Sequence, residues 1–165
     1  MQYAGKMDGD LTLLNNKKII TISGSLELGG AERQALRYAL YLRNEFDADI
    51  EVCGFYSPGK AAEFCDRNAI PWRILTNPLS EKRGVHRFFR FRAFVHEIST
   101  MHPDIILPYT LIPNVAAGLS WRKTGAKLCV WNQRDGGIER FDQKLESRAL
   151  HNTPLALANS RSGAG

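Results

Sequence analysis

Short runs of strand-forming apolar residues alternate along this chain with longer segments in which apolar residues recur at helical spacing. This alternation is typical of repeated βα units on a parallel sheet. The predicted strands cover residues 18–23, 49–55, 72–75, 104–108, 127–132 and 155–158. The predicted helices cover residues 31–46, 60–68, 85–102, 113–123 and 140–150.

Several predicted strands are almost continuously apolar, as in "IEVCGF", "DIILP" and "KLCVWN". Strands of this kind are covered by helices on both faces, so the pattern predicts an α/β fold with a doubly wound sheet. Ligands of such folds bind outside the carboxyl ends of the strands. We therefore look for candidate chemistry at residues 24–30, 55–59, 108–112, 133–137 and 159–161.

The composition is that of a globular domain, since 44% of the 165 residues are hydrophobic and 24% are charged. We expect residues 18–165 to form one domain. Residues 1–17 contain Asp8 and Asp10 and no apolar signal-peptide core, which predicts a disordered leader, either native or left by expression cloning. No segment approaches the roughly 20 apolar residues of a membrane span, so we expect a cytoplasmic protein.

The charge balance indicates an anionic partner. A net charge of +5 and a pI near 9.3 favour a nucleotide, a phospholipid or a nucleic acid. The basic residues are dispersed and no nucleic-acid module is recognisable, so we expect no nucleic-acid partner. Cys53, Cys65 and Cys129 lie apart in apolar sequence, which predicts buried reduced thiols. No CxxC or HxxxH spacing occurs, and we expect no metal.

The segment "SLELGGAER" at residues 25–33 joins the first strand to the first helix. A glycine turn at a helix amino end suits an anion, because free N–H groups and the helix dipole point at one place. Gly24, Gly29 and Gly30 do not have the spacing of a dinucleotide fingerprint, and no P-loop lysine follows them. The alternative is a tight turn, with Glu32 complementing the first helical turn.

"GGAER" after the first strand, followed by an amphipathic helix, resembles the N-terminal half of GT-B-fold retaining glycosyltransferases of the family-4 type. The closing "LALANSRSGAG" is similar to the segment after that domain's sixth strand. The resemblance implies a Rossmann-like doubly wound, mainly parallel sheet of about six strands with helices on both faces. It also implies a domain that holds the acceptor, facing a second domain that holds the nucleotide sugar.

The resemblance implies that Gly29, Gly30 and Glu32 reach the donor diphosphate and the transferred sugar. The expected reaction is hexosyl transfer, with retention, from a nucleotide sugar to a glycan or lipid-linked acceptor in cell-surface polysaccharide synthesis. No cofactor or metal is implied. Gln133 stands where the family often has a histidine. Because glutamine does not titrate near neutrality, an acid or base role there is in doubt and the catalytic residue stays unassigned.

The candidate acceptor-binding residues follow three of the strands. Tyr109 and Thr110 come after the fourth, and the alternative for Tyr109 is a packing role. Ser160 follows the sixth, with helix capping as its alternative. After the fifth strand come Gln133, Arg134 and Asp135. Arg134 could pair with a phosphate, and Asp135 could accept hydrogen bonds from sugar hydroxyls. An Arg134–Asp135 ion pair that orders the loop is the alternative.

The segment "EKRGVHRFFRFRAFVHEIST" is rich in arginine and phenylalanine. Helical periodicity predicts one core face, formed by Phe88, Phe91, Phe94, Val95 and Ile98. Phe89 instead falls among basic residues on the predicted wet face. Such a surface suits peripheral contact with an anionic membrane on its inner face. The candidates are Arg87, Phe89, Arg90 and Arg92. The alternative is a solvated basic face with one stray phenylalanine.

Family-4 enzymes are about twice this length, and their second domain carries an acidic E-x7-E motif that is absent here. We therefore expect a fragment, truncated before the nucleotide-sugar-binding domain and inactive alone, because only one wall of the site is present. Two alternatives stay open. One is half of a nucleotide-sugar epimerase, and the other is a stand-alone nucleotide- or phosphate-binding Rossmann module.

Overall fold

The computed structural model describes residues 14–80, 84–133 and 142–158. Every predicted strand and helix is present, with shifts of a few residues at the ends. The strands are β1 (Lys18–Ser23), β2 (Asp49–Gly54), β3 (Trp72–Ile74), β4 (Ile105–Pro108), β5 (Leu128–Gln133) and β6 (Leu155–Ala158). The helices are α1 (Gly30–Phe46), α2 (Lys60–Arg67), α3 (Val85–Ser99), α4 (Leu111–Ser120) with the 3-10 turn η2 (Trp121–Lys123), and α5 (Gln143–Asn152).

The six strands form one parallel sheet in the order β3-β2-β1-β4-β5-β6. The chain first adds strands on one side of β1 and then crosses over to add β4, β5 and β6 on the other. The strand order therefore reverses between β1 and β4. In doubly wound sheets this reversal is where the crevice for ligands opens, at the carboxyl ends of the strands.

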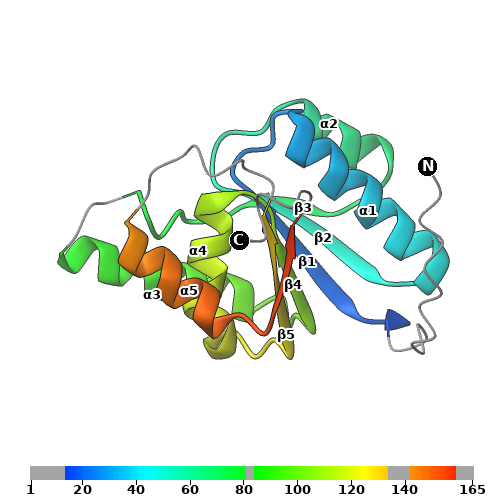
Figure 1. Ribbon diagram of the computed structural model, residues 1–165. Coiled ribbons are helices and arrows are strands. Elements are labelled where there is room, and N and C mark those ends of the chain that lie inside the picture. Colours follow the sequence, from blue (N-terminus) through cyan, green and yellow to red (C-terminus); the bar gives the residue numbers. More distant parts are fainter. Residues whose placement is uncertain (1–13, 81–83, 134–141, 159–165) are drawn as a thin grey trace.

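Helices cover both faces of the sheet, as the apolar strands predict (Figure 1). α1 and α2 lie on one face, and α3, α4 and α5 lie on the other. Successive side chains of β1 pack on opposite faces of the sheet, because side chains alternate along a strand. Ile19 packs in the core under α1 and α2, whereas Ile20 and Ile22 pack under α3 and α4. This confirms the predicted Rossmann-like, doubly wound α/β fold.

The three cysteines are buried and unpaired, as predicted. Burial raises the pKa of Cys65 to about 11 and that of Cys129 to about 12, and it raises the pKa of Cys53 further. The thiols therefore stay protonated at neutral pH and act as small apolar side chains.

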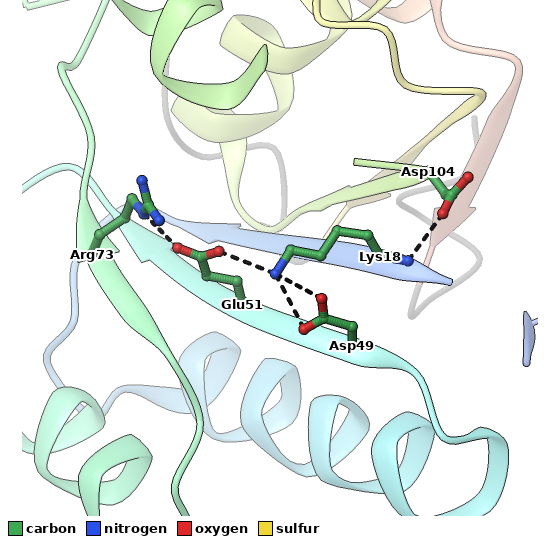
Figure 2. Close-up of polar contacts among 5 residues, drawn as sticks. All are labelled: Lys18, Asp49, Glu51, Arg73 and Asp104. Atoms are coloured by element: carbon green, nitrogen blue, oxygen red, sulfur yellow. Dashed lines mark hydrogen bonds and ion pairs between the residues drawn. The ribbon is translucent and has the colours of Figure 1, made fainter. Parts of the chain in front are cut away.

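An ionic network ties the first three strands together (Figure 2). The carboxylate of Glu51, which is buried, pairs with the guanidinium of Arg73 and with Nζ of Lys18, 3.3 Å away. Asp49 forms a second ion pair with the same ammonium group, with Oδ2 of Asp49 3.1 Å from Nζ of Lys18. Lys18 and Asp49 begin their strands, so the network reaches the amino edge of the sheet, opposite the edge where ligands of doubly wound folds bind.

The predicted core face of α3 is wrong in its first turn. Phe94 and Ile98 are fully buried, and Phe91 and Val95 are partly buried. Phe88 is 59% exposed, although periodicity places it with them. Phe88 belongs to the first turn of α3, and this end of the helix extends beyond the sheet in Figure 1. Phe89 is 60% exposed, as predicted.

Candidate functional site

The loop between β1 and α1 is packed against the domain at Leu26 and exposed to solvent where it enters α1. Leu26 is buried, and its carbonyl accepts a hydrogen bond from the backbone N–H of Ala61 at 2.9 Å. The side chain of Leu26 fills the space above Gly54, where a β-carbon would lie 2.7 Å from its Cγ. These contacts fix the loop to β2 and α2. The following residues, Gly29 and Gly30, are exposed.

The fold itself requires glycine at neither Gly29 nor Gly30. Gly29 has φ −83° and ψ −173°, which is extended backbone open to any residue. A β-carbon there would meet only the flexible carboxylate of Glu32. A β-carbon on Gly30 would have nothing within 4 Å. Neither the backbone conformation nor the packing at these two positions therefore excludes other residues. α1 begins here without a side-chain cap, so no N-cap side chain takes up the N–H groups of its first turn.

Gly24 and Thr110 meet at the reversal of strand order. They follow β1 and β4, and the hydroxyl oxygen of Thr110 lies 3.4 Å from the place of a β-carbon on Gly24. Thr110 has φ 69° and ψ 168°, a region of backbone space that is essentially restricted to glycine. A β-branched residue held there is strained by about 1–3 kcal/mol, and such strain clusters at binding sites.

Two buried asparagines join the elements next to Thr110. Asn114 of α4 accepts a hydrogen bond from the backbone N–H of Asn132 in β5 at 3.1 Å and donates one to its carbonyl at 2.8 Å. The side-chain amide of Asn132 donates to the carbonyls of Pro108 at 3.0 Å and Val130 at 2.9 Å. The amides therefore lock α4, β4 and β5 together just below Thr110. Neither residue was predicted as part of the site. The sequence signal that could have indicated them is a single asparagine within an otherwise apolar segment, "LIPNVAAGL" for Asn114 and "KLCVWNQ" for Asn132.

The side chain of Gln133 has a defined orientation. The indole N–H of Trp131 donates a hydrogen bond to Oε1 of Gln133 at 2.8 Å. Because an indole nitrogen only donates, the oxygen of Gln133 must face it, and the NH₂ group points away from the indole. At the carboxyl end of β5, Gln133 is thus a hydrogen-bond donor and not an acid or base.

The other predicted site residues divide into three groups. Tyr109 is only 2% exposed and packs in the core under α1 and α2, so it offers no surface to a ligand here. Glu32 is partly buried, with its carboxylate beside Gly29. Three predicted residues lie outside the described residues: Arg134, Asp135 and Ser160.

Polar groups of three kinds thus follow the carboxyl ends of β1, β4 and β5: the amino ends of α1 and α4, the hydroxyl of Thr110 and the side-chain amide of Gln133. These groups suit a phosphate or a sugar hydroxyl. Within the described ranges, no group of three or more His, Cys, Asp or Glu side chains is placed to hold a metal ion. No helix there has both the length and the apolarity to cross a membrane.

Comparisons with known proteins bear on the fold. No protein-family model matches the sequence, and no curated protein matches it. The structure is similar to the crystal structure of Alr3699/HepE from Anabaena in complex with UDP and glucose, with a TM-score of 0.65 and 22% identity over 89% of this chain. The chain spans 39% of that protein's length. At this identity the likeness establishes the shared fold.

Proposed function

We propose that this chain is the acceptor-side domain of a GT-B glycosyltransferase of the retaining, family-4 type. It forms one wall of a cleft in which a sugar passes from a nucleotide sugar to a glycan or a lipid-linked acceptor. The similar Anabaena protein, of which this chain matches part, is in complex with UDP and glucose, and that supports a nucleotide sugar as the donor. Cell-surface polysaccharide synthesis in the cytoplasm fits these substrates.

The observation that carries the proposal is the exposed glycine pair. Gly29 and Gly30 stand at the uncapped amino end of α1 and are required by neither the backbone conformation nor the packing. Their value lies in letting a diphosphate and its sugar approach backbone N–H groups directly. The strain at Thr110, which lies beside Gly24 at the start of the same loop, supports a site at this end of the sheet, because strained backbone persists where function selects it.

In this mechanism the chain supplies position and hydrogen bonds. N–H donors at α1 stabilise the charge that develops on the leaving diphosphate, an effect that preorganised donors provide without reorganisation. Thr110 and the amide of Gln133 hold sugar hydroxyls of the acceptor. Gln133 carries no proton transfer, since its amide does not titrate near neutrality. Cationic groups and the remaining donor contacts come from the facing domain.

The test is a substitution in the full-length gene product. Gly30→Val fills the clearance, so turnover of a panel of nucleotide sugars should fall at least about 100-fold, while thermal unfolding stays near wild type. Asn44→Val is the matched control, because Asn44 is exposed at the other end of α1. Unchanged turnover in Gly30→Val would contradict the proposal.

The isolated chain provides a second test. We expect no transfer and no nucleotide-sugar hydrolysis by residues 1–165 alone, because one wall cannot enclose donor and acceptor. Calorimetric titration with UDP and with UDP-glucose separates the alternatives. Micromolar binding by the isolated chain would favour a stand-alone nucleotide-binding module, whereas weak or undetectable binding is expected of an acceptor-side domain.

A further inference from the structure

The first half of α3 carries an apolar and basic surface that the fold does not use. Val85, Phe88 and Phe89 are 66%, 59% and 60% exposed, and the rings of Phe88 and Phe89 pack edge to face at 5.7 Å. Figure 1 shows this end of α3 extending beyond the sheet. Large apolar side chains gathered at one protruding helix end mark an interaction surface.

Beside these residues a groove of about 690 Å³ runs between α3 and the end of α4 with η2. Its apolar lining comes from Phe88, Phe91, Val95 and Leu119. Its basic lining includes Arg87, Arg92 and Lys123. Among the described residues that line it, none is acidic. We call this the α3 groove.

The charged side chains that line the α3 groove, among the described residues, are all basic. The guanidinium groups of Arg87 and Arg92 lie 6.0 Å from the ring centres of Phe91 and Phe88, so cation and apolar surface form one patch. Glu97 is the sole acidic residue of α3. Its carboxylate accepts hydrogen bonds from the backbone N–H of Thr76 at 2.8 Å and from the Thr76 hydroxyl at 2.6 Å. The positive end of the α3 dipole adds to the field.

We propose that the α3 groove and the exposed Phe88 and Phe89 form a docking site for an anionic phospholipid membrane. Lipid phosphates sit against Arg87, Arg92 and Lys123. Phe88 and Phe89 enter the boundary between head groups and acyl chains, and the apolar floor of the groove accepts part of a chain. Exposed phenylalanines among arginines on a helix are the combination that binds such an interface. The charge of an acidic protein would match the arginines but would not by itself account for the exposed phenylalanine pair.

Co-sedimentation of the 165-residue chain with vesicles tests this proposal. Vesicles of phosphatidylcholine with phosphatidylglycerol should bind the chain, vesicles of phosphatidylcholine alone should bind it far less, and added salt should weaken binding. The double variant Arg87→Gln/Arg92→Gln should partition about 20- to 30-fold less, because each basic residue near an anionic surface contributes about fivefold. Phe88→Ser/Phe89→Ser should lose about tenfold or more.

The matched control is Arg37→Gln/Arg67→Gln, which removes the same charge from exposed sites on α1 and α2, on the other face. It should keep nearly wild-type partitioning. The four substituted side chains of α3 are not part of the buried core, so thermal unfolding should stay close to wild type in both α3 variants. Equal loss in the control variant, equal binding to neutral vesicles, or binding to an acidic peptide but not to vesicles would each overturn the proposal.

Discussion

At the carboxyl end of β5, the indole Nε1–H of Trp131 donates a hydrogen bond to the side-chain oxygen Oε1 of Gln133, with 2.8 Å between the two atoms. Residues two apart on a strand point to the same side of the sheet, so the pair is a local consequence of the sequence. The buried indole takes the glutamine oxygen as its acceptor, so the NH₂ group is the part of the side chain turned away from the indole.

Gln133→Glu tests this arrangement. Trp131 can still donate to a carboxylate oxygen, so the free energy of unfolding should change by less than about 1 kcal/mol. The NH₂ donor is lost and a negative charge is added at the carboxyl end of β5, so on the proposed function KM for the acceptor in the full-length protein should rise about tenfold or more. Steady-state kinetics and denaturant unfolding measure the two effects. Gln133→Glu with unchanged kinetics would remove Gln133 from the site.

The strain at Thr110 predicts a trade between stability and function. Thr110→Gly relieves a backbone conformation that suits glycine, so the protein should be stabilised by about 1 kcal/mol, while losing the hydroxyl should weaken acceptor binding. The control is Thr100→Gly, where φ is −66°. Glycine adds flexibility there and removes the hydrogen bond from the Thr100 hydroxyl to the carbonyl of Glu97 at 2.8 Å, so a loss of about 1–2 kcal/mol is expected. Thermal unfolding distinguishes them, and destabilisation by Thr110→Gly would mean that no strain is stored there.

The sequence predicted the elements because each strand and helix is encoded locally, by apolar runs and by helical periodicity. Phe88 shows the limit of that logic. Periodicity identifies a helix face, but whether the face is covered depends on how far the helix extends past its neighbours. The positive φ of Thr110 depends on the geometry of the β4–α4 junction, which no pattern in "LPYTLIPN" encodes.

The asparagine pair was beyond sequence reasoning for a related reason. Asn114 and Asn132 are 18 residues apart and meet only because α4 packs against β5 in one register. The glycine pair lies at the predicted junction of β1 and α1, and a β-carbon on Gly30 would have nothing within 4 Å. Its role toward a ligand stays a prediction.

Asn114→Ala should destabilise the domain by about 2–4 kcal/mol. The change leaves the backbone N–H and carbonyl of Asn132 buried without their partners, and each orphaned group costs about 1–3 kcal/mol. Denaturant unfolding measures the loss, with the exposed Asn44→Ala as control, for which less than about 0.5 kcal/mol is expected. Equal effects of the two substitutions would show that the amide pair adds nothing to stability.

Asp104 gives the stability of the amino edge a pH dependence. Its hydrogen bond from Nζ of Lys127, at 2.7 Å, and a second from the backbone N–H of Lys18, at 3.0 Å, hold its pKa below the ordinary value of 3.8. A carboxyl group with a lowered pKa in the folded state stabilises the fold above its ordinary pKa, and this contribution disappears as the pH falls through the folded value.

Asp104→Asn should therefore lower the free energy of unfolding at pH 7 by about 0.5–1 kcal/mol, since the charge is lost and an oxygen acceptor is kept. The gap between wild type and variant should close as the pH is lowered from 5 toward 2, and it should narrow with added salt. Urea unfolding over this pH series measures it, with the exposed Asp47→Asn as the matched charge removal. A gap that widens on acidification would mean that protonated Asp104 is the stabilising form.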